Sequence, residues 1–538
     1  MERRVKHWSE VISQRIIEEK EEPFVIASGI TTSGPTHMGT ACEFLYPSAL
    51  ARYLEDNGYK TEFVFIGDLM DAFDRIPRSL QRFTFLKEHL GKPLCKVPDP
   101  YGCCGSYGEH FLNETMDLME KLEVDPKILR TDELYASGRY DPYARLFHAR
   151  GDQVKGIARR VAKISGAPAL PSWIDVVMPI CENCGRIATT VVKSFDGSTI
   201  RYSCSRDVGY AKGCGYSGEM SISDHRYKLF WRLDWPSRQD FLGVSAELAG
   251  ADHHTRGGSW ETAVAVHREI FNKDPPIGHK YGFVLLHGKK YSKSKGMGLS
   301  VQELLKLVPP MLIKYDLFKT DVEENKEFDP SGHKLIRLYD EYQRAADLYE
   351  SGGRLRRAEE KMVLAYKLST DRRMWRASFT DMLMYYQIYR DWDKVAEVVG
   401  DEEGVGYLKR YIERWVSQEY LPEEFAFTFK PERIRAYESE LAILARSLDE
   451  RMSAEEVHNL VYTIAKERGV DAPSLFKAIY LTLIGKDHGP RLGRLIVAIG
   501  VDKVKKIMTE MYEKRGGDSC ERSINAGRPF VGPSPKNS

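Results

Sequence analysis

The chain has 538 residues, 29% of them charged, and a formal net charge of +1. This length predicts three or four domains and excludes a small binding module. The near-neutral charge gives no support for nucleic-acid binding, so any RNA contact must come from local patches such as Arg354, Arg356 and Arg357, or Arg372 and Arg373. No apolar stretch approaches the roughly 20 residues that span a bilayer, so we expect a cytoplasmic protein without a membrane partner.

A β-α-β unit is predicted between Pro23 and Asp71. An apolar run, Phe24 to Ile30, has the length of a buried strand, and apolar residues then recur at helical spacing from His37 to Tyr59. A second strand is predicted at Thr61 to Ile66. The turn after the first strand therefore presents unpaired helical amides, which favour an anion such as a triphosphate.

The residues of this turn predict a nucleotide site. We expect His37 to donate a ring hydrogen bond to a phosphoryl oxygen, Gly39 to let an adenine ring lie against the helix, and Thr40 to add a hydroxyl. An ordinary loop-to-helix junction is the alternative, because short motifs of this kind also occur by chance. The residues expected to contact ATP here are Thr32, Ser33, Pro35, His37, Gly39 and Thr40.

Residues 95–222 are predicted to form an insertion that contains a helix, Tyr107 to Leu122, and two candidate zinc sites. The first candidate has four possible ligands within twelve positions, on a compact loop with Pro100 and Gly102: Asp99, Cys103, Cys104 and His110. Two small buried cysteines beside an exposed acid and histidine are the alternative.

The second candidate is a four-thiolate site. Cys181 and Cys184 form a Cys-x2-Cys pair, and Cys204 and Cys214 follow a predicted β-hairpin whose turn is at Asp196 and Gly197. Nine residues separate Cys204 from Cys214, where two to four are usual, so the membership of Cys214 stays open. Metal is favoured over disulfides in a reducing cytosol, and both sites would stabilise structure rather than catalyse.

Strand and helix patterns return from about Trp231 to Leu286 and are expected to complete a parallel sheet. Within them, Gly250 and Asp252 form a turn whose carboxylate can accept a ribose hydroxyl, with an ordinary turn as the alternative. A strand is predicted at Tyr281 to Leu286, followed by a glycine-flanked basic loop, Lys290 to Ser294. A solvated surface loop is the alternative for this last segment.

The chain becomes helical after about Ser300. Tyrosines that recur at helical spacing from Tyr385 to Trp392 are expected to be core rather than a base-stacking platform. Helices are predicted at 301–307, 335–350, 354–368, 380–392, 405–417, 431–448, 454–468 and 474–483. Residues 516–538 are expected to be a flexible tail.

Two of these segments, Pro35 to Thr40 and Lys290 to Ser294, resemble the two nucleotide-handling signatures of class I aminoacyl-tRNA synthetases. The second matches the Lys-Met-Ser-Lys-Ser pattern except for Tyr291, and Thr40 is a mild departure from the first. Together with Ala27 to Gly34, Trp231 to Pro236 and Gly250 to His254, they make the whole chain resemble the class I lysyl-tRNA synthetases of archaea and some bacteria.

This resemblance implies an α/β Rossmann-type catalytic domain with a zinc-binding insertion, followed by an all-α C-terminal domain. The expected boundaries are 1–94 and 223–299 for the two Rossmann halves, 95–222 for the insertion, 300–515 for the helical stem and anticodon-binding domain, and 516–538 for the tail. The implied reaction joins lysine to tRNA-Lys through lysyl-adenylate, with Mg²⁺ accompanying ATP, structural Zn²⁺, and bound tRNA needed for activation.

The same resemblance assigns site residues. His37 and Lys293 are expected to offset charge that develops on the phosphates, as the catalytic pair. Further ATP contacts are expected from Gly250, Asp252, Lys290, Ser292, Lys293 and Ser294. The lysine pocket is expected to contain Gly29, Thr31, Asp68, Trp231, His253 and Tyr281, with Asp71, Glu43 and Trp235 as further candidates to hold the lysine ammonium.

Three alternatives remain open at this stage. A class I synthetase for glutamate would share both signatures but would need cations around the substrate side chain. A transferase that forms dinucleotide-like cofactors would not need the long helical region. A tRNA-binding paralogue without activity would not need both His37 and Lys293.

Overall fold

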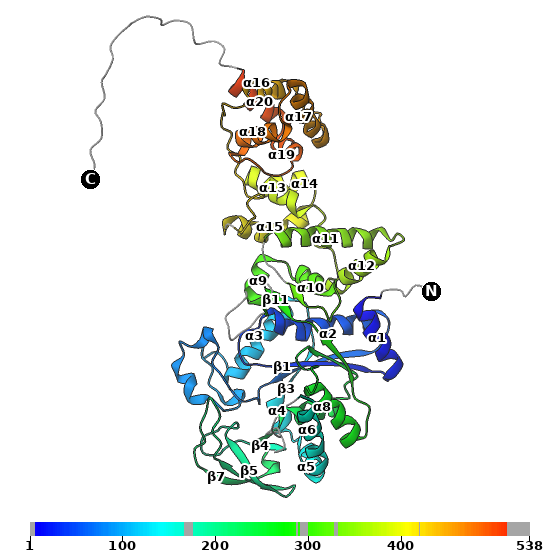
Figure 1. Cartoon of the computed structure of the whole chain (residues 1–538), viewed down its shortest axis with the longest axis vertical. Coiled ribbons are helices and arrows are strands. Elements are labelled where there is room, and N and C mark those ends of the chain that lie inside the picture. The colour runs from blue at the N-terminus through cyan, green and yellow to red at the C-terminus, as the bar shows by residue number, and fades with distance from the viewer. Residues whose placement is uncertain are drawn as a thin grey trace, which may run out of the picture. The chain divides into compact units, whose positions relative to one another are not determined.

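The computed structural model describes residues 6–165, 176–286, 289–290, 300–327, 332–418 and 420–513. The chain forms two compact units, one ending at Arg376 and one beginning at Ala377. The colours of Figure 1 follow the chain through both of them. Among the described residues, no helix has the length and apolar character needed to cross a bilayer.

The first unit is built around a parallel five-stranded sheet with the order β10-β9-β1-β2-β3. The strands are β1 (Phe24–Thr31), β2 (Thr61–Asp68), β3 (Lys127–Arg130), β9 (Ala246–Gly250) and β10 (Ile277–Tyr281). β2 and β3 lie on one side of β1, whereas β9 and β10, which come later in the chain, lie on the other side. The strand order therefore reverses between β1 and β9, and ligands of such sheets bind at the carboxyl ends beside that point.

The predicted β-α-β unit is confirmed, with α2 (Met38–Asp56) joining β1 to β2. Eleven residues of α2 are buried, among them Phe44 and Leu45, and α1 (Trp8–Glu19) packs Trp8 edge-on against Tyr46 of α2 at 5.5 Å between ring centroids. On the other side of the switch, α7 (Trp231–Leu242) precedes β9, and α8 (Ser259–Val266) joins β9 to β10. In Figure 1, α8 lies near the labelled strands β1 and β3.

The predicted insertion is more closely joined to the sheet than its boundaries imply, because β3 falls within residues 95–222 and pairs with β2. The helix predicted at 107–122 is confirmed as α3 (Tyr107–Lys121), and the predicted hairpin is confirmed as β5 (Thr190–Phe195) and β6 (Thr199–Cys204). The other helices and strands within these bounds are α4 (Thr131–Ala136), α5 (Asp141–Ala149), α6 (Gly151–Ser165), β4 (Val177–Pro179) and β7 (Ser217–Ser221). β8 (Tyr227–Leu229) follows them and pairs with β4.

The prediction of one strand from Tyr281 to Leu286 is wrong. β10 ends at Tyr281, and β11 (Val284–Leu286) belongs to a second small sheet with β12 (Lys289–Lys290) and β13 (Lys326–Glu327). The break is at Gly282, whose amide donates to the Val322 carbonyl at 2.9 Å. A Cβ at this position would lie 2.2 Å from the Glu324 carbonyl oxygen, so only glycine permits the crossing.

Four helices complete the described part of the first unit: α9 (Val301–Leu307), α10 (Pro310–Phe318), α11 (Gly332–Ser351) and α12 (Arg357–Ser369). The prediction located three of them and missed α10. That helix is buried on most of its surface and so lacks the alternation of polar and apolar residues that the prediction relied on.

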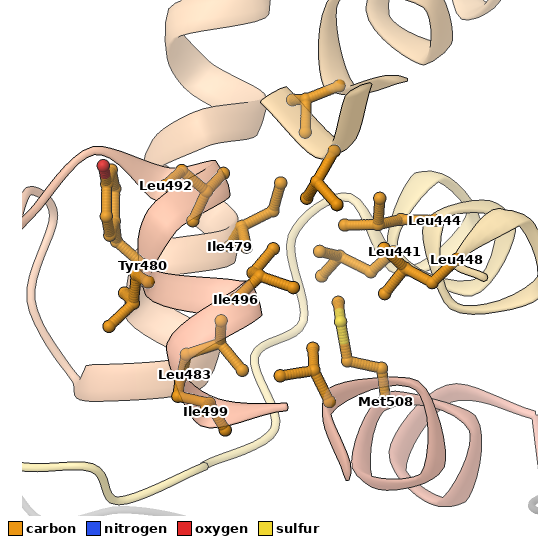
Figure 2. Close-up of a cluster of buried hydrophobic side chains, with 14 of the residues drawn as sticks. Leu441, Leu444, Leu448, Ile479, Tyr480, Leu483, Leu492, Ile496, Ile499 and Met508 are labelled. Atoms are coloured by element: carbon orange, nitrogen blue, oxygen red, sulfur yellow. The ribbon is translucent and has the colours of Figure 1, made fainter. Parts of the chain in front are cut away.

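The second unit is entirely helical in its described part. Its helices are α13 (Phe379–Tyr389), α14 (Trp392–Val399), α15 (Glu402–Ser417), α16 (Glu438–Ser447), α17 (Ala454–Arg468), α18 (Ala472–Ile484), α19 (Leu492–Ile499) and α20 (Val501–Tyr512). Leucine, isoleucine and methionine side chains from α16 to α20 meet in one apolar cluster, shown in Figure 2.

Two predicted helices in this unit have different bounds in the structure. The helix predicted at 380–392 stops at Tyr389, because Arg390 takes a left-handed conformation with φ of 54° and caps α13. The helix predicted at 431–448 begins only at Glu438, after the left-handed Tyr437. The preceding segment is instead bonded to α18, through Lys430 and Glu432 amides that donate to the carbonyls of Leu483 and Thr482.

Candidate active site

A cavity of about 720 Å³ lies at the carboxyl ends of β1, β2, β9 and β10, beside the point where the strand order reverses. Eleven residues expected to bind nucleotide or lysine line it: Gly29, Thr31, His37, Gly39, Thr40, Asp68, Trp231, Gly250, Asp252, His253 and Tyr281. Thr32, Ser33 and Pro35 are not among its lining residues. Of the basic loop, only the backbone of Lys290 is described, as part of β12, and Ser292, Lys293 and Ser294 lie outside the described residues.

His37 is the N-cap residue of α2, and its ring accepts a hydrogen bond on Nδ1 from the Thr40 amide at 3.1 Å. A neutral ring that accepts on Nδ1 carries its hydrogen on Nε2. His37 therefore satisfies one unpaired amide of the helix and presents a donor on its other nitrogen. This is the geometry expected of a residue that donates to a phosphoryl oxygen.

Gly39 permits the capping position of His37. A Cβ at position 39 would lie 3.2 Å from Cε1 and 3.3 Å from Nδ1 of the His37 ring, so a methyl group would push the ring away from the Thr40 amide. Gly29 has a different role, because a Cβ there would lie 2.6 Å from the Ile66 carbonyl oxygen on the neighbouring strand. A glycine is required at position 29 because β1 and β2 pair closely there.

Asp68, expected to hold the substrate ammonium, is already bonded to an ammonium of the protein. Lys228 on β8 donates to both of its carboxylate oxygens, at 2.8 and 3.0 Å, and the Lys228 side chain is 3% exposed. Burial alone would raise the pKa of Asp68, but Lys228 and then Arg238 overcome that effect and hold it below its ordinary value. Asp68 thus forms a charge-compensated wall of the cavity.

Asp71 belongs to the same network. It accepts a hydrogen bond from Lys228 and another from the hydroxyl of Thr31, at 2.6 Å. Burial lowers the pKa of Lys228, but Asp68 and Asp71 outweigh it and raise the pKa above its ordinary value, so this lysine stays charged. The network therefore fixes Thr31 at the cavity wall.

Glu43 on α2 is a buried acid of the cavity without such compensation. It accepts hydrogen bonds from the Ser28 hydroxyl, at 3.1 Å, and from the Tyr281 hydroxyl. No cation in the described part of the chain forms an ion pair with it. Burial is the main cause that raises the pKa of Glu43 to about 8, against the two hydrogen bonds. A cationic ligand would restore the charged form.

Aromatic rings also line the cavity. The ring of His253 packs edge-on against Trp235 at 5.4 Å and Trp231 at 6.4 Å, and its Nδ1 lies 2.9 Å from the Ser259 hydroxyl. His254, the other histidine of the turn, stacks on Trp260 at 5.1 Å instead of lining the cavity. Trp231 is 38% exposed, so its ring is accessible to a ligand.

The sulfur atoms of Cys181, Cys184, Cys204 and Cys214 lie within 4.8 Å of one another. The Cys181–Cys214 and Cys184–Cys204 sulfur pairs are each 3.7 Å apart. Four sulfurs at about 2.3 Å from a tetrahedral zinc ion would be about 3.8 Å apart, whereas a disulfide requires about 2.05 Å. The positions fit zinc, and they bring Cys214 into the cluster despite its long spacing in sequence.

The mixed cluster is also brought together. The ligand atoms of Asp99, Cys103, Cys104 and His110 lie within 4.8 Å of one another, with 3.2 Å between the Cys103 sulfur and His110 Nδ1. The Asp99 carboxylate accepts the backbone amides of Tyr101, Cys103 and Cys104, which folds the loop around it. The donor set fits a divalent metal such as zinc.

Sequence reasoning missed two cations of the cavity region, Lys228 and Arg238. Arg238 lines the cavity and lies 3.5 Å from Asp234 and 3.7 Å from Asp68. Lys228 occupies the middle of a three-residue buried strand, Tyr227–Leu229, where the local pattern offers no sign of a charged partner. Only the pairing of β8 with β4 and the fold of the insertion bring it to the end of β2.

The strand order, the cavity at the switch point and the capped helix define a class I synthetase fold, and residues 6–372 match the family described as tRNA synthetases class I (K). The chain belongs to this family.

Curated relatives carry a more particular name. A lysine–tRNA ligase of Archaeoglobus fulgidus is 34% identical over 93% of this chain and 99% of its own length. A lysine–tRNA ligase of Methanosarcina barkeri is 32% identical over 96% of this chain and 99% of its own, and that of Methanocaldococcus jannaschii is 29% identical over 93% and 98%.

Proposed function

We propose that this protein is a lysine–tRNA ligase, which joins L-lysine to tRNA-Lys in the cytoplasm, through lysyl-adenylate, and releases AMP and diphosphate. Family membership and near full-length relatives of that name support this function. The observation that carries the choice of substrate is Glu43, a carboxyl group in the cavity without a protein cation. A lysine ammonium would supply the missing charge.

In the first step, the lysine carboxylate attacks the α-phosphorus of ATP and diphosphate leaves. His37 donates from Nε2 to a phosphoryl oxygen as charge develops there, and the amino-terminal turn of α2 adds its dipole. Lys293 of the basic loop supplies a positive charge to the phosphates. Asp252 lies two residues after Gly250, the last residue of β9, and its carboxylate accepts a hydrogen bond from a ribose hydroxyl. Mg²⁺ bound with ATP neutralises phosphate charge.

The lysine lies with its ammonium at Glu43 and Tyr281 and its aliphatic chain against Trp231 and His253. Gly29 and Thr31 border the same space, with Thr31 held by Asp71. Asp68 contributes through the network with Lys228 rather than by direct contact with the ligand. In the second step, a terminal adenosine hydroxyl of the tRNA, the 2′ hydroxyl in class I enzymes, attacks the adenylate carbonyl and AMP leaves.

A glutamate substrate would need an unpaired cation in the cavity. Two arginines line it. Arg238 lies between Asp234 and Asp68 and is 14% exposed, and Arg75 is 68% exposed and lies 3.9 Å from Asp74. A substrate carboxylate beside Glu43 would also find no cation there. Both observations favour lysine over glutamate.

Two structural zinc ions complete the proposed holoenzyme. Cys181, Cys184, Cys204 and Cys214 would hold one, and Asp99, Cys103, Cys104 and His110 would hold the other. Zinc at these positions would crosslink loops and take no part in the chemistry. For the helical unit that begins at Ala377, we propose tRNA binding, in keeping with the helical stem and anticodon-binding domain expected from about residue 300.

The test is amino-acid-dependent exchange of labelled diphosphate into ATP, run over the standard amino acids with and without tRNA. We expect exchange with lysine, and only when tRNA is present. Exchange with glutamate would move the function to the alternative specificity. Absence of exchange with any amino acid, despite tRNA binding, would favour an inactive paralogue.

A further inference from the structure

The hydroxyl group of Tyr135, on α4, joins the end of β8 to the beginning of α7. It accepts a hydrogen bond from the Leu229 amide, at 2.8 Å, and donates one to the Asp234 carboxylate, at 2.5 Å. Leu229 is the last residue of β8, and Asp234 lies in the first turn of α7. Burial raises the pKa of Tyr135 well above its ordinary value, so the hydroxyl keeps its proton and remains a donor. The two bonds therefore fix the junction between β8 and α7.

This junction carries Trp231, the first residue of α7, whose side chain lines the active-site cavity. Phe230, the N-cap residue, forms no side-chain capping bond, so the start of the helix is not fixed by a polar cap of its own. The Trp231 ring is 38% exposed, and its neighbours are the Arg232 guanidinium, at 5.1 Å, and the His253 ring, at 6.4 Å. A ring with so much open surface takes its position from the backbone that carries it.

The helix α4 is itself bonded to the end of β2. The Thr131 hydroxyl accepts the amides of Leu69 and Met70, at 3.0 and 3.2 Å, and donates to the Asp68 carboxylate, at 3.1 Å. Thr131 and Tyr135 are four residues apart and so share one face of α4. This face connects the end of β2 with the start of α7, and residues of both line the cavity.

Two further tyrosines belong to the same buried cluster but have other partners. The Tyr140 ring stacks on Tyr135 at 4.0 Å between centroids, and its hydroxyl lies 3.4 Å from Asp234. Tyr227 packs edge-on against Tyr135 at 5.7 Å, and its hydroxyl donates to Asp141 on α5, at 2.7 Å. Tyr227 thus offers a comparison, because its buried hydroxyl also bonds to a carboxylate, but on α5 rather than on α7.

We propose that Tyr135 is a positioning residue for the lysine pocket, whose hydroxyl fixes the start of α7 and so holds the Trp231 ring against the aliphatic chain of the lysine. Tyr135 is not among the residues that line the cavity, so it acts through α7 rather than by contact with the substrate. Without the hydroxyl, the Leu229 amide and the Asp234 carboxylate each lose a partner, and the first turn of α7 is free to shift. The inference rests on the proposed function, which places the lysine chain against Trp231.

The test measures attachment of lysine to tRNA-Lys by the full-length protein over a range of lysine concentrations. Tyr135→Phe removes the hydroxyl and keeps the ring that stacks on Tyr140. We expect the KM for lysine to rise about 5- to 20-fold, as for loss of one hydrogen bond to a charged group. The kcat and the KM for ATP should change less than about twofold, because the ATP contacts at the start of α2 stay in place.

Tyr227→Phe is the matched control, since it removes an equally buried hydroxyl from the same cluster. It should lower the temperature of unfolding by about as much as Tyr135→Phe does, and it should leave the KM for lysine unchanged. An equal rise of the lysine KM in both variants would overturn the inference, because general loosening of the cluster would then explain the effect.

Trp231→Ala shows whether the effect passes through the ring. When Trp231 is already alanine, Tyr135→Phe should raise the lysine KM by less than about twofold, because coupled residues do not act additively. The full rise in both backgrounds would overturn the inference. Asp234→Asn tests the same contact from its other partner if Tyr135→Phe folds poorly, and we expect the same rise and the same dependence on Trp231.

Two outcomes separate this inference from the proposed function. If Tyr135→Phe unfolds at a lower temperature but attaches lysine with the wild-type KM, Tyr135 supports only the fold, so the inference fails and the proposed function stands. If the wild-type protein attaches no lysine to tRNA, the proposed function fails and the inference fails with it.

Discussion

The ammonium of Lys228 lies 2.8 Å from a carboxylate oxygen of Asp68, at the end of the second strand of the parallel sheet. Lys228 lies on β8, which pairs with β4 of the insertion, and Asp68 ends β2 of the sheet, so this contact joins the two parts and fixes the charge of one wall of the cavity. Glu43 is a carboxyl group of the cavity for which the described residues supply no ion-pair partner.

Replacement of Lys228 by methionine leaves Asp68 and Asp71 without their buried cation. We expect the free energy of unfolding to fall by about 3–5 kcal/mol at neutral pH, measured by chemical denaturation. Lys228 and Arg238 hold the pKa of Asp68 below its ordinary value, so the stability that this acid contributes is present above pH 4 and lost as the pH falls. The deficit of the variant should therefore shrink in acid.

Lys306→Met is the matched control, because Lys306 pairs with Glu303 on the surface, where both side chains are about half exposed. It should change stability by less than about 1 kcal/mol. Equal losses in the two variants would contradict a buried network at Asp68.

Glu43→Gln removes the charge proposed to hold the lysine ammonium. We expect the KM for lysine to rise about 100-fold or more, with little change in the KM for ATP. Because the pKa of Glu43 is raised to about 8 by burial, kcat/KM for lysine of the wild type should rise with pH up to about 8 and then level off. The variant should lack that rise. A variant with unchanged lysine KM would place the ammonium elsewhere.

In the absence of ligand, we expect Glu43→Gln to stabilise the protein by an amount that depends on pH. An acid whose pKa is higher in the folded state binds more protons there, so the folded state loses stability as the pH rises from about 4.5 to about 8. Glu43→Gln should therefore unfold at a higher temperature than wild type at pH 8, with a smaller difference at pH 5. Thermal unfolding at the two pH values measures this, and a pH-independent difference would argue against a desolvated carboxyl group.

Gly39→Ala should displace the His37 ring, since the added Cβ would lie 3.2 Å from it. We expect kcat/KM for ATP to fall about tenfold, equivalent to about 1.4 kcal/mol, with little loss of stability. Gly406→Ala in α15, where a Cβ meets no atom within 4 Å, should leave activity unchanged and raise stability by about 0.5–1 kcal/mol. Full activity of Gly39→Ala would contradict the role of the capping geometry.

Cys214→Ser should release one of two zinc ions per molecule and lower the temperature of unfolding, because the four-sulfur cluster loses a ligand. Cys95→Ser, outside both clusters, should keep both ions. Zinc content by elemental analysis and thermal unfolding measure the two effects. Two ions retained by Cys214→Ser would exclude this cysteine as a ligand.

Local pattern was enough to predict the β-α-β start, α3 and the hairpin of the insertion, because an apolar run, helical spacing and a turn at Asp196 and Gly197 can each be read from neighbouring residues. Local pattern did not predict the structure at positions where contacts between residues far apart in sequence determine it. The chain leaves the sheet at Gly282 because of contacts with residues 322–324, and the segment before Glu438 is not helical because it bonds to α18.

The candidate site also contains residues that could be located from sequence and residues that could not. The two signatures and the cysteine clusters could be located from sequence, and His37, Gly39 and Asp252 do line the cavity. The partner of Asp68 could not be predicted, because Lys228 is 160 residues away and its strand carries no local sign of the pairing. Choosing Glu43 over Asp68 therefore required the structure.

The most direct test of the central claim is an aminoacylation assay with tRNA-Lys, ATP and an equal mixture of the standard amino acids, with the aminoacyl-adenosine of the product identified by mass spectrometry. We predict lysyl-adenosine, formed only when ATP is present and lost when Glu43 is replaced by glutamine at limiting lysine. Glutamyl-adenosine, or tRNA that stays uncharged, would contradict the account.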